Sequence, residues 1–113
     1  MSEAAPSRVI IDLNAYTSNL ATIRQRIPKH CKLMPVLKAN AYGHGAVPMA
    51  RCAIQAGADM VAVATIDEAA EMREGGIHAP ILLLIQPDPE FLGAVVEYDL
   101  RPMISDVATA QQL

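Results

Sequence analysis

The sequence lacks the features of a membrane-spanning protein and of an exported one. None of its apolar runs approaches the ~20 residues that a helix needs to cross a bilayer. The first residues, MSEAAPS, contain neither the cationic segment nor the apolar segment of a secretory leader. These absences predict a cytoplasmic protein with no membrane partner.

Cysteine and basic charge are also scarce. Cys31 and Cys52 are the only cysteines and form no CxxC pair, so we expect reduced thiols and no metal site. The nine Lys and Arg residues are scattered along a chain of formal net charge −3, which argues against nucleic acid as a partner. With 52% hydrophobic and 19% charged residues in 113, the composition predicts one globular domain or part of one.

What the sequence does contain is a repeating pattern of short apolar runs. They begin at Leu33, Met60, Ile81 and Met103, between 21 and 27 positions apart, and a helical pattern follows each. The runs are continuous rather than alternating, which is typical of parallel strands covered by helices on both faces. Two α/β architectures fit, a doubly wound open sheet and the first half of a (β/α)8 barrel. In both, ligands bind at the carboxyl ends of the strands.

Local signals give the expected bounds of these elements. The predicted strands cover Arg8–Asp12, Lys32–Lys38, Asp59–Ala64, Pro80–Ile85 and Arg101–Ser105. Five helices are predicted. The first ends at Pro28, and the second covers Val47–Ala56 and stops at Gly57. The third begins with a capping box of Thr65 and Glu68, the fourth begins at Asp88-Pro89, and the fifth is capped by Ser105.

Lys38 stands at the end of one of these strands, where ligand chemistry is expected. A strand-terminal lysine can simply extend its amine into water. The loop that follows argues for more, because Asn40 and Tyr42 offer polar contacts and Gly43 and Gly45 allow positive φ. A desolvated lysine amine is a nucleophile toward carbonyls, so a Schiff-base site is a plausible use.

Other titratable residues near this loop have simpler interpretations. His44 lies between two glycines, and we expect it to fix the loop or cap the next helix rather than to act in catalysis. A group of carboxylates follows the capping threonine, and a solvated helix face with favourable charge in its first turn explains them. That group consists of Asp67, Glu68, Glu71 and Glu74.

The loop belongs to a longer motif that resembles a known family. The stretch VLKANAYGHG is similar to the pyridoxal-phosphate lysine motif of alanine racemases in all eight residues from Lys38 to Gly45. The segments IDLNAYTSNL and AGADMVAVATIDEAAEMREGGIHAPILLL resemble the amino-terminal barrel portion of the same family. The resemblance implies that residues 1–113 are the first four strands of a (β/α)8 TIM barrel, with the rest of the barrel and a carboxyl-terminal β domain outside the chain.

The resemblance also implies roles for individual residues. Lys38 would bind pyridoxal 5'-phosphate as an internal aldimine and act as one of two bases that interconvert L-alanine and D-alanine, supplying D-alanine for peptidoglycan. Tyr42 would hydrogen-bond the cofactor phosphate, and Val36 and Leu84 would pack against its ring. The arginine that faces the pyridine nitrogen and the tyrosine that is the second base would lie outside the chain. That tyrosine would come from the other subunit of a homodimer.

Three alternatives remain open. A serine racemase or a broad-specificity racemase resembles the same motif, and most residues that size the substrate pocket would lie outside the chain. A non-catalytic cofactor-binding remnant is the third. The chain ends at ATAQQL, inside an expected helix, so we expect a fragment that is inactive by itself.

Overall fold

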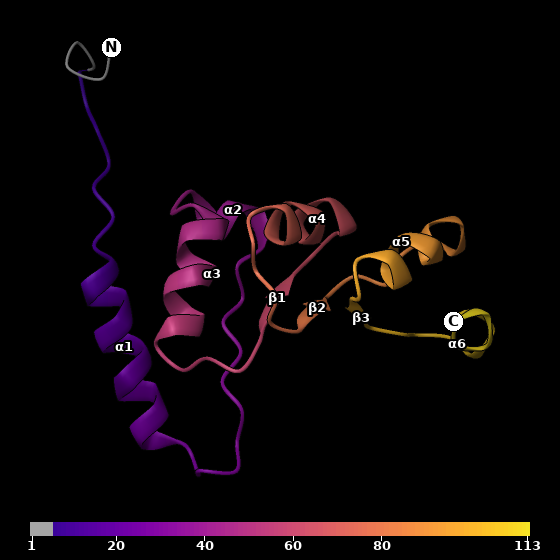
Figure 1. Cartoon of the computed structure of the whole chain (residues 1–113), viewed down its shortest axis with the longest axis horizontal. Coiled ribbons are helices and arrows are strands. Elements are labelled where there is room, and N and C mark those ends of the chain that lie inside the picture. The colour runs from indigo at the N-terminus through magenta and orange to yellow at the C-terminus, as the bar shows by residue number, and fades with distance from the viewer. Residues whose placement is uncertain (1–5) are drawn as a thin grey trace.

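The computed structural model describes residues 6–113 and shows helices alternating with the strands of one parallel sheet (Figure 1). The sheet has the order β1-β2-β3 and is not closed. This arrangement confirms the predicted α/β class. The elements in chain order are α1 (Leu13–Arg26), α2 (Lys38–Tyr42), α3 (Ala46–Gln55), β1 (Val61–Val63), α4 (Ile66–Glu74), β2 (Ile81–Leu83), the 3-10 turn η2 (Pro89–Phe91), α5 (Leu92–Glu97), β3 (Arg101–Pro102) and α6 (Val107–Gln112).

The expected strand Lys32–Lys38 lies beside β1 but pairs with it only at a single bridge. Val36 pairs in parallel with Ala62, through a 2.8 Å bond from the Leu37 N–H to the Ala62 carbonyl and a 3.0 Å bond from the Ala62 N–H to the Pro35 carbonyl. Pro35 has no N–H to donate on the side that faces β1, so the ladder cannot extend backward as a regular strand. The segment still reaches the sheet and carries Lys38 to its carboxyl edge.

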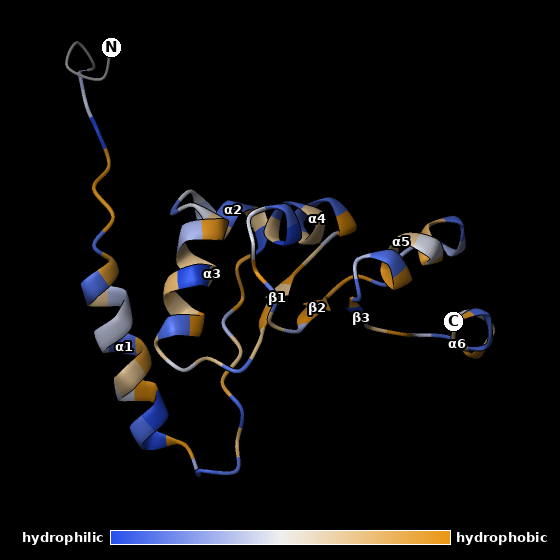
Figure 2. Cartoon of the chain, viewed as in Figure 1, coloured by the Kyte–Doolittle hydropathy of each residue, from blue (hydrophilic) through white to orange (hydrophobic). Residues whose placement is uncertain are grey.

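The core lies between one face of the sheet and the helices. Leu37, Val61, Val63, Ile81 and Leu83 are almost completely buried and share a cluster with side chains of α3 and α4. They occupy alternate positions of their strands, so they point to one face. Figure 2 shows β1 and β2 in the hydrophobic colour. The intervening residues must therefore face the opposite side of the sheet.

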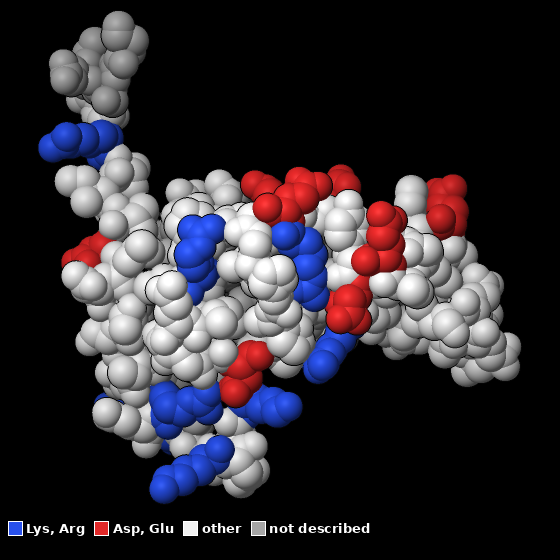
Figure 3. All heavy atoms as spheres, in the orientation of Figure 1, with Lys and Arg blue, Asp and Glu red and all other residues white. Residues whose placement is uncertain are grey.

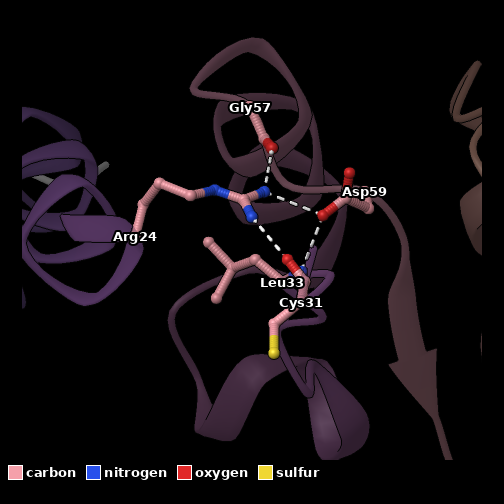
Figure 4. Close-up of polar contacts among 5 residues, drawn as sticks. All are labelled: Arg24, Cys31, Leu33, Gly57 and Asp59. Atoms are coloured by element: carbon pink, nitrogen blue, oxygen red, sulfur yellow. Dashed lines mark hydrogen bonds and ion pairs between the residues drawn. The ribbon is translucent and has the colours of Figure 1, made fainter. Parts of the chain in front are cut away.

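Arg24 of α1 makes several of the polar contacts that join this helix to the chain that follows it (Figure 4). The Arg24 guanidinium donates to the carbonyls of Cys31 and Gly57, both at 2.9 Å, and pairs with the Asp59 carboxylate at 2.8 Å. The same carboxylate oxygen accepts the Leu33 N–H at 2.6 Å. These bonds lower the pKa of Asp59, and the bond from the Leu33 N–H has a larger effect than the bond from Arg24. The network fixes the start of the segment that leads to Lys38.

The predicted strand Arg8–Asp12 is wrong. No described residue pairs with its backbone, and Val9 and Ile10 are 84% and 77% exposed. Figure 2 shows this stretch as an extended apolar segment that leads into α1. Asp12 caps α1 instead, where its carboxylate accepts the N–H groups of Asn14 and Ala15. An apolar run becomes a strand only when a neighbour satisfies its backbone groups, and here none does.

The last predicted strand and its cap also need correction. The strand Arg101–Ser105 is reduced to Arg101–Pro102, at the edge of the sheet. Asp106 rather than Ser105 caps α6, because its carboxylate accepts the Thr109 N–H at 2.7 Å. The Ser105 N–H and hydroxyl donate to Gln86 instead, and Gln86 also donates to Asp106. The bonds from Gln86 and Thr109 lower the pKa of Asp106.

The other predicted helix boundaries agree closely with the structure. Thr65 and Glu68 form the predicted capping box, and Gly75 ends α4. The predicted helix Val47–Ala56 is α3, one residue earlier at each end. Asp88 precedes η2 as expected but makes no capping bond with its side chain.

The described part of the chain is open and unevenly charged. Its radius of gyration is 16.1 Å, whereas a compact domain of this length has about 13 Å. Acidic side chains gather over α4 and α5, and basic ones gather near the end of α1 (Figure 3). Residues 6–113 include no helix that is long and apolar enough to cross a membrane.

Candidate functional site at the Lys38 turn

The backbone directly after Lys38 forms a left-handed turn, the element labelled α2. Ala39, Asn40, Ala41 and Tyr42 have φ between 53° and 55°, although none of them is glycine. The left-handed conformation costs roughly 1–2 kcal/mol for each such residue. Four in succession persist only when surrounding contacts hold them, and such strained backbone clusters at functional sites.

Hydrogen bonds inside the loop supply part of that support. The Asn40 carbonyl accepts the N–H groups of Gly43 and Gly45, both at 3.1 Å, and its side-chain oxygen accepts the Ala46 N–H at 2.8 Å. Gly43 and Gly45 have φ of 93° and 91°, which explains why the motif has glycine at both positions. Asn40 therefore ties the turn to the first residue of α3.

His44 belongs to this supporting set. Its Nδ1 lies 2.8 Å from the Ala41 carbonyl, within the same turn. The contact agrees with the expectation that His44 fixes the loop. No group of three or more His, Cys, Asp or Glu residues that could hold a metal occurs among residues 6–113.

A second support comes from α4, and the sequence interpretation missed it. The Glu68 Oε2 atom accepts the Ala39 N–H at 2.5 Å, and its Oε1 atom accepts the N–H groups of Ala64 and Thr65 at 2.8 and 3.1 Å. The capping-box spacing predicted only the bond to Thr65. The interpretation of Glu68 as part of a solvated face is therefore wrong, since its carboxylate joins the carboxyl end of β1 to the turn after Lys38.

Lys38 itself is half-buried and directly follows the buried Leu37. Among residues 6–113 the Lys38 amine has no hydrogen-bond partner. It also makes no ion pair there, since the ion pair of that part of the chain is between Arg24 and Asp59. An amine without a carboxylate partner is available to react or to bind. Lys38 thus lies where the parallel sheet predicts ligand chemistry.

Val36 and Leu84 lie on the same face of the sheet. The register aligns Val36 with Ala62 and Ala62 with Leu82, and Leu84 continues β2 through a 2.8 Å bond from its N–H to the Val63 carbonyl. Side chains at positions 82 and 84 share a face because they are two residues apart. The two predicted ring contacts therefore lie on the side of the sheet that faces away from the core cluster.

Tyr42 and Val36 line one groove of about 340 Å³ between α1 and the segment before Lys38. The Tyr42 side chain is 72% exposed, so its hydroxyl is accessible. Tyr16 also lines the groove, and its buried hydroxyl has no hydrogen-bond partner among residues 6–113. Burial raises the pKa of Tyr16, and the nearby Cys52 raises it further.

These residues fit a cofactor that carries an aldehyde, a flat ring and a phosphate. The unpaired Lys38 amine suits the aldehyde, and the open apolar face with Val36 and Leu84 suits the ring. The turn leaves room beside it, because a Cβ added at Gly43 would meet no atom within 4 Å. The exposed Tyr42 hydroxyl is a free donor for an anion.

Comparison with known proteins gives a consistent result. A family model described as alanine racemase, N-terminal domain, matches residues 11–113. Among curated relatives, the alanine racemase of Symbiobacterium thermophilum is 44% identical over 108 residues, which are 96% of this chain and 28% of that protein.

Solved structures share the fold. The alanine racemase of E. faecalis superposes with a TM-score of 0.86 at 40% identity, over 89% of this chain and 27% of that one. The Bacillus anthracis alanine racemase with bound L-Ala-P gives 0.85 at 36% identity, over 96% and 29%. A histidine racemase from Leuconostoc mesenteroides subsp. sake gives 0.80 at 32% identity, over 96% and 30%.

The chain spans less than a third of the length of each of these proteins. The similar solved structures favour the barrel over the doubly wound sheet. The unclosed sheet of this chain corresponds to part of that barrel. Because the family model covers all but the first ten residues and the resemblance extends through sequence and structure, the chain belongs to the alanine racemase N-terminal domain family.

Proposed function

We propose that this chain is the amino-terminal part of a pyridoxal-phosphate-dependent alanine racemase. The observation that carries the proposal is the unpaired Lys38 at the carboxyl edge of the sheet, followed by a strained turn that contacts from two helices hold in place. Evolutionary relationship supports the same reaction class, since the relatives reported above are racemases.

In this proposal the side chains divide the work by their chemistry. The Lys38 amine binds the cofactor and moves the alanine α-proton on one face of the site. Tyr42 donates its hydroxyl to the cofactor phosphate, and Val36 and Leu84 hold the ring against the open face of the sheet. Pyridoxal phosphate, when bound, supplies the electron sink that makes the α-proton removable.

The proposal places the remaining machinery outside residues 1–113. A racemase needs a proton-transfer group on each face of the bound substrate, and Lys38 is one of them. We infer that the second group, most phosphate contacts and the dimer partner belong to the rest of a cytoplasmic homodimer that supplies D-alanine for peptidoglycan. The isolated chain is then inactive.

A second candidate is a racemase of the same family with another or a broader substrate range. The histidine racemase that shares this fold at 32% identity shows that the fold does not fix the substrate. Serine racemase and a non-catalytic remnant are further alternatives. The test below separates these possibilities by including more than one amino acid.

The test uses the protein that carries this chain, purified with pyridoxal phosphate. Borohydride should fix the cofactor on Lys38, and peptide mapping should find it there rather than on Lys29 or Lys32. The K38A variant should lose the cofactor absorbance band and at least ~10² of the racemisation rate, because one proton-transfer group is absent. K32A is the matched control and should keep both.

Each outcome has a distinct meaning. Faster turnover of L-alanine than of L-serine or L-histidine supports an alanine racemase, and the reverse order supports the second candidate. Cofactor fixed on Lys38 without any racemisation supports the remnant. Cofactor fixed on a different lysine would remove the central claim.

A further inference from the structure

We propose that Glu68 is a positioning residue for Lys38, an inference that rests on the proposed role of Lys38. The carboxylate lies on the first turn of α4, and it bonds to the backbone directly after the lysine. It touches neither the lysine amine nor the groove that Tyr42 lines. Its effect on the reaction must therefore pass through the backbone.

The two carboxylate oxygens serve different segments. Oε1 accepts N–H groups from Ala64 and Thr65, at the carboxyl end of β1. Oε2 accepts the N–H of Ala39, which is 29 residues away and is the first residue of the left-handed turn. The carboxylate thus joins two neighbouring strand ends across the edge where the site lies.

The bond to Ala39 exceeds what helix capping requires. A capping box uses one side-chain acceptor for the backbone N–H of the N-cap residue, and here Oε1 meets that need at Thr65. The other backbone N–H bonds of the turn, such as those to Asn40 and Ala41, stay within the loop. Glu68 is therefore a side-chain contact that ties the first residue of the turn, next to Lys38, to the end of β1.

Loss of this contact should displace the lysine rather than unfold the protein. The left-handed residues are strained, so a turn without its first anchor can relax toward ordinary backbone conformations and carry Lys38 with it. A displacement of about 1 Å at a reacting group can lower a rate by ~10²-fold. Substrate binding by other parts of the site would change less.

Glutamine separates the two functions of the side chain. Glu68→Gln keeps the size, but it offers one acceptor oxygen and one NH2 donor. Whichever way the amide turns, either Ala39 or the Ala64–Thr65 pair faces a donor instead of an acceptor. We expect faster amide hydrogen exchange over residues 39–42 in the cofactor-free protein, at least about tenfold at Ala39. We also expect kcat for alanine to fall ~10- to 10²-fold, with KM changed less than about twofold.

Two control variants exclude general effects. Glu71→Gln makes the same change of charge one turn further along α4, at an exposed side chain with no hydrogen bond among residues 6–113. Thr65→Ala removes the hydroxyl half of the capping box, a 3.3 Å bond to the Glu68 N–H, while leaving the three carboxylate bonds possible. Both should keep wild-type exchange at Ala39 and wild-type kcat, and Thr65→Ala should loosen only the first turn of α4.

The experiment combines these variants in the protein that carries this chain. Exchange at Ala39 is followed without cofactor, borohydride fixation on Lys38 with cofactor, and kcat and KM with alanine. Selective loss in E68Q supports the proposal, and E68Q with wild-type exchange and kcat overturns it. If E68Q fails to fold, the wild type still decides, because Ala39 is exposed and only a hydrogen bond can protect its amide. An unprotected Ala39 amide would overturn the proposal, whereas wild-type protein without fixation on Lys38 would instead overturn the proposed function.

Discussion

Gly75 provides a sharp test of how α3 packs against α4. A Cβ built at this position would lie 2.6 Å from Cγ1 and 3.1 Å from Cγ2 of Val47, on α3. Gly75 has φ of −78°, so an alanine would meet no backbone strain there and the clash alone would decide the outcome. Val47 is β-branched and is held to one main rotamer in a helix, so its methyl groups cannot simply turn away.

The size of the effect follows from that overlap. Ordinary contact begins near 3.4 Å, so G75A must push the two helices apart or rotate Val47 out of its rotamer. Such overpacking costs about 1–3 kcal/mol of unfolding free energy. The change also strains the bond from the Arg51 guanidinium to the Gly75 carbonyl, 3.0 Å long. We expect G75A to lower the urea midpoint of the protein that carries this chain, with an unchanged m-value.

Gly93 is the matched control, because it lies inside α5 and an added Cβ would meet nothing within 4 Å. The same substitution there reduces the conformational freedom of the unfolded chain without a clash, so G93A should raise stability by about 0.4–1 kcal/mol. Urea unfolding followed by circular dichroism compares the two variants. A G75A protein as stable as wild type, or a destabilised G93A, would refute the packing described here.

Two further predictions concern charged residues. The bonds from Leu33 and Arg24 lower the pKa of Asp59 in the folded state, so Asp59 stabilises the fold above about pH 4 and loses that effect as the pH falls further. D59N should therefore be less stable than wild type at pH 7, and the difference should shrink as the pH falls below about 4. Equal differences in urea midpoint at pH 7 and at the lowest pH where the protein is folded would contradict this. Arg73 donates to the backbone carbonyls of Ile77, Ala79, Tyr98 and Asp99. A lysine at this position keeps the charge but cannot reach all four carbonyls, so R73K should lower the unfolding free energy by about 1–3 kcal/mol. An unchanged urea midpoint would count against this prediction.

The helices could be predicted well because their boundaries are set by local chemistry. The capping box of Thr65 and Glu68 and the glycines that end the helices act within a few residues of chain. Such signals need no knowledge of the tertiary structure. The helix α3 accordingly differs from its predicted bounds by one residue at each end.

The strands were harder because their existence depends on neighbours. Arg8–Asp12 contains an apolar run like that of a buried strand, yet no described residue pairs with it as a neighbouring strand. Arg101–Ser105 pairs with β2 over only two residues, since its last residue bonds instead to the Gln86 side chain. Composition reveals that a segment can be buried, and only the fold determines whether a partner strand is present.

The Lys38 turn combines both situations. Its residues suggest a candidate site, because a lysine at a strand end before two glycines is visible in the sequence. Its left-handed backbone is not visible, since alanine and tyrosine disfavour that conformation and the glycines come only after it. Besides bonds within the loop, the turn has a non-local contact with the Glu68 carboxylate from another helix. Local pattern therefore singles out Lys38 as the candidate reactive residue, whereas the contact between the turn after it and the Glu68 carboxylate could not be foreseen, because the sequence context of Glu68 predicts only a helix cap.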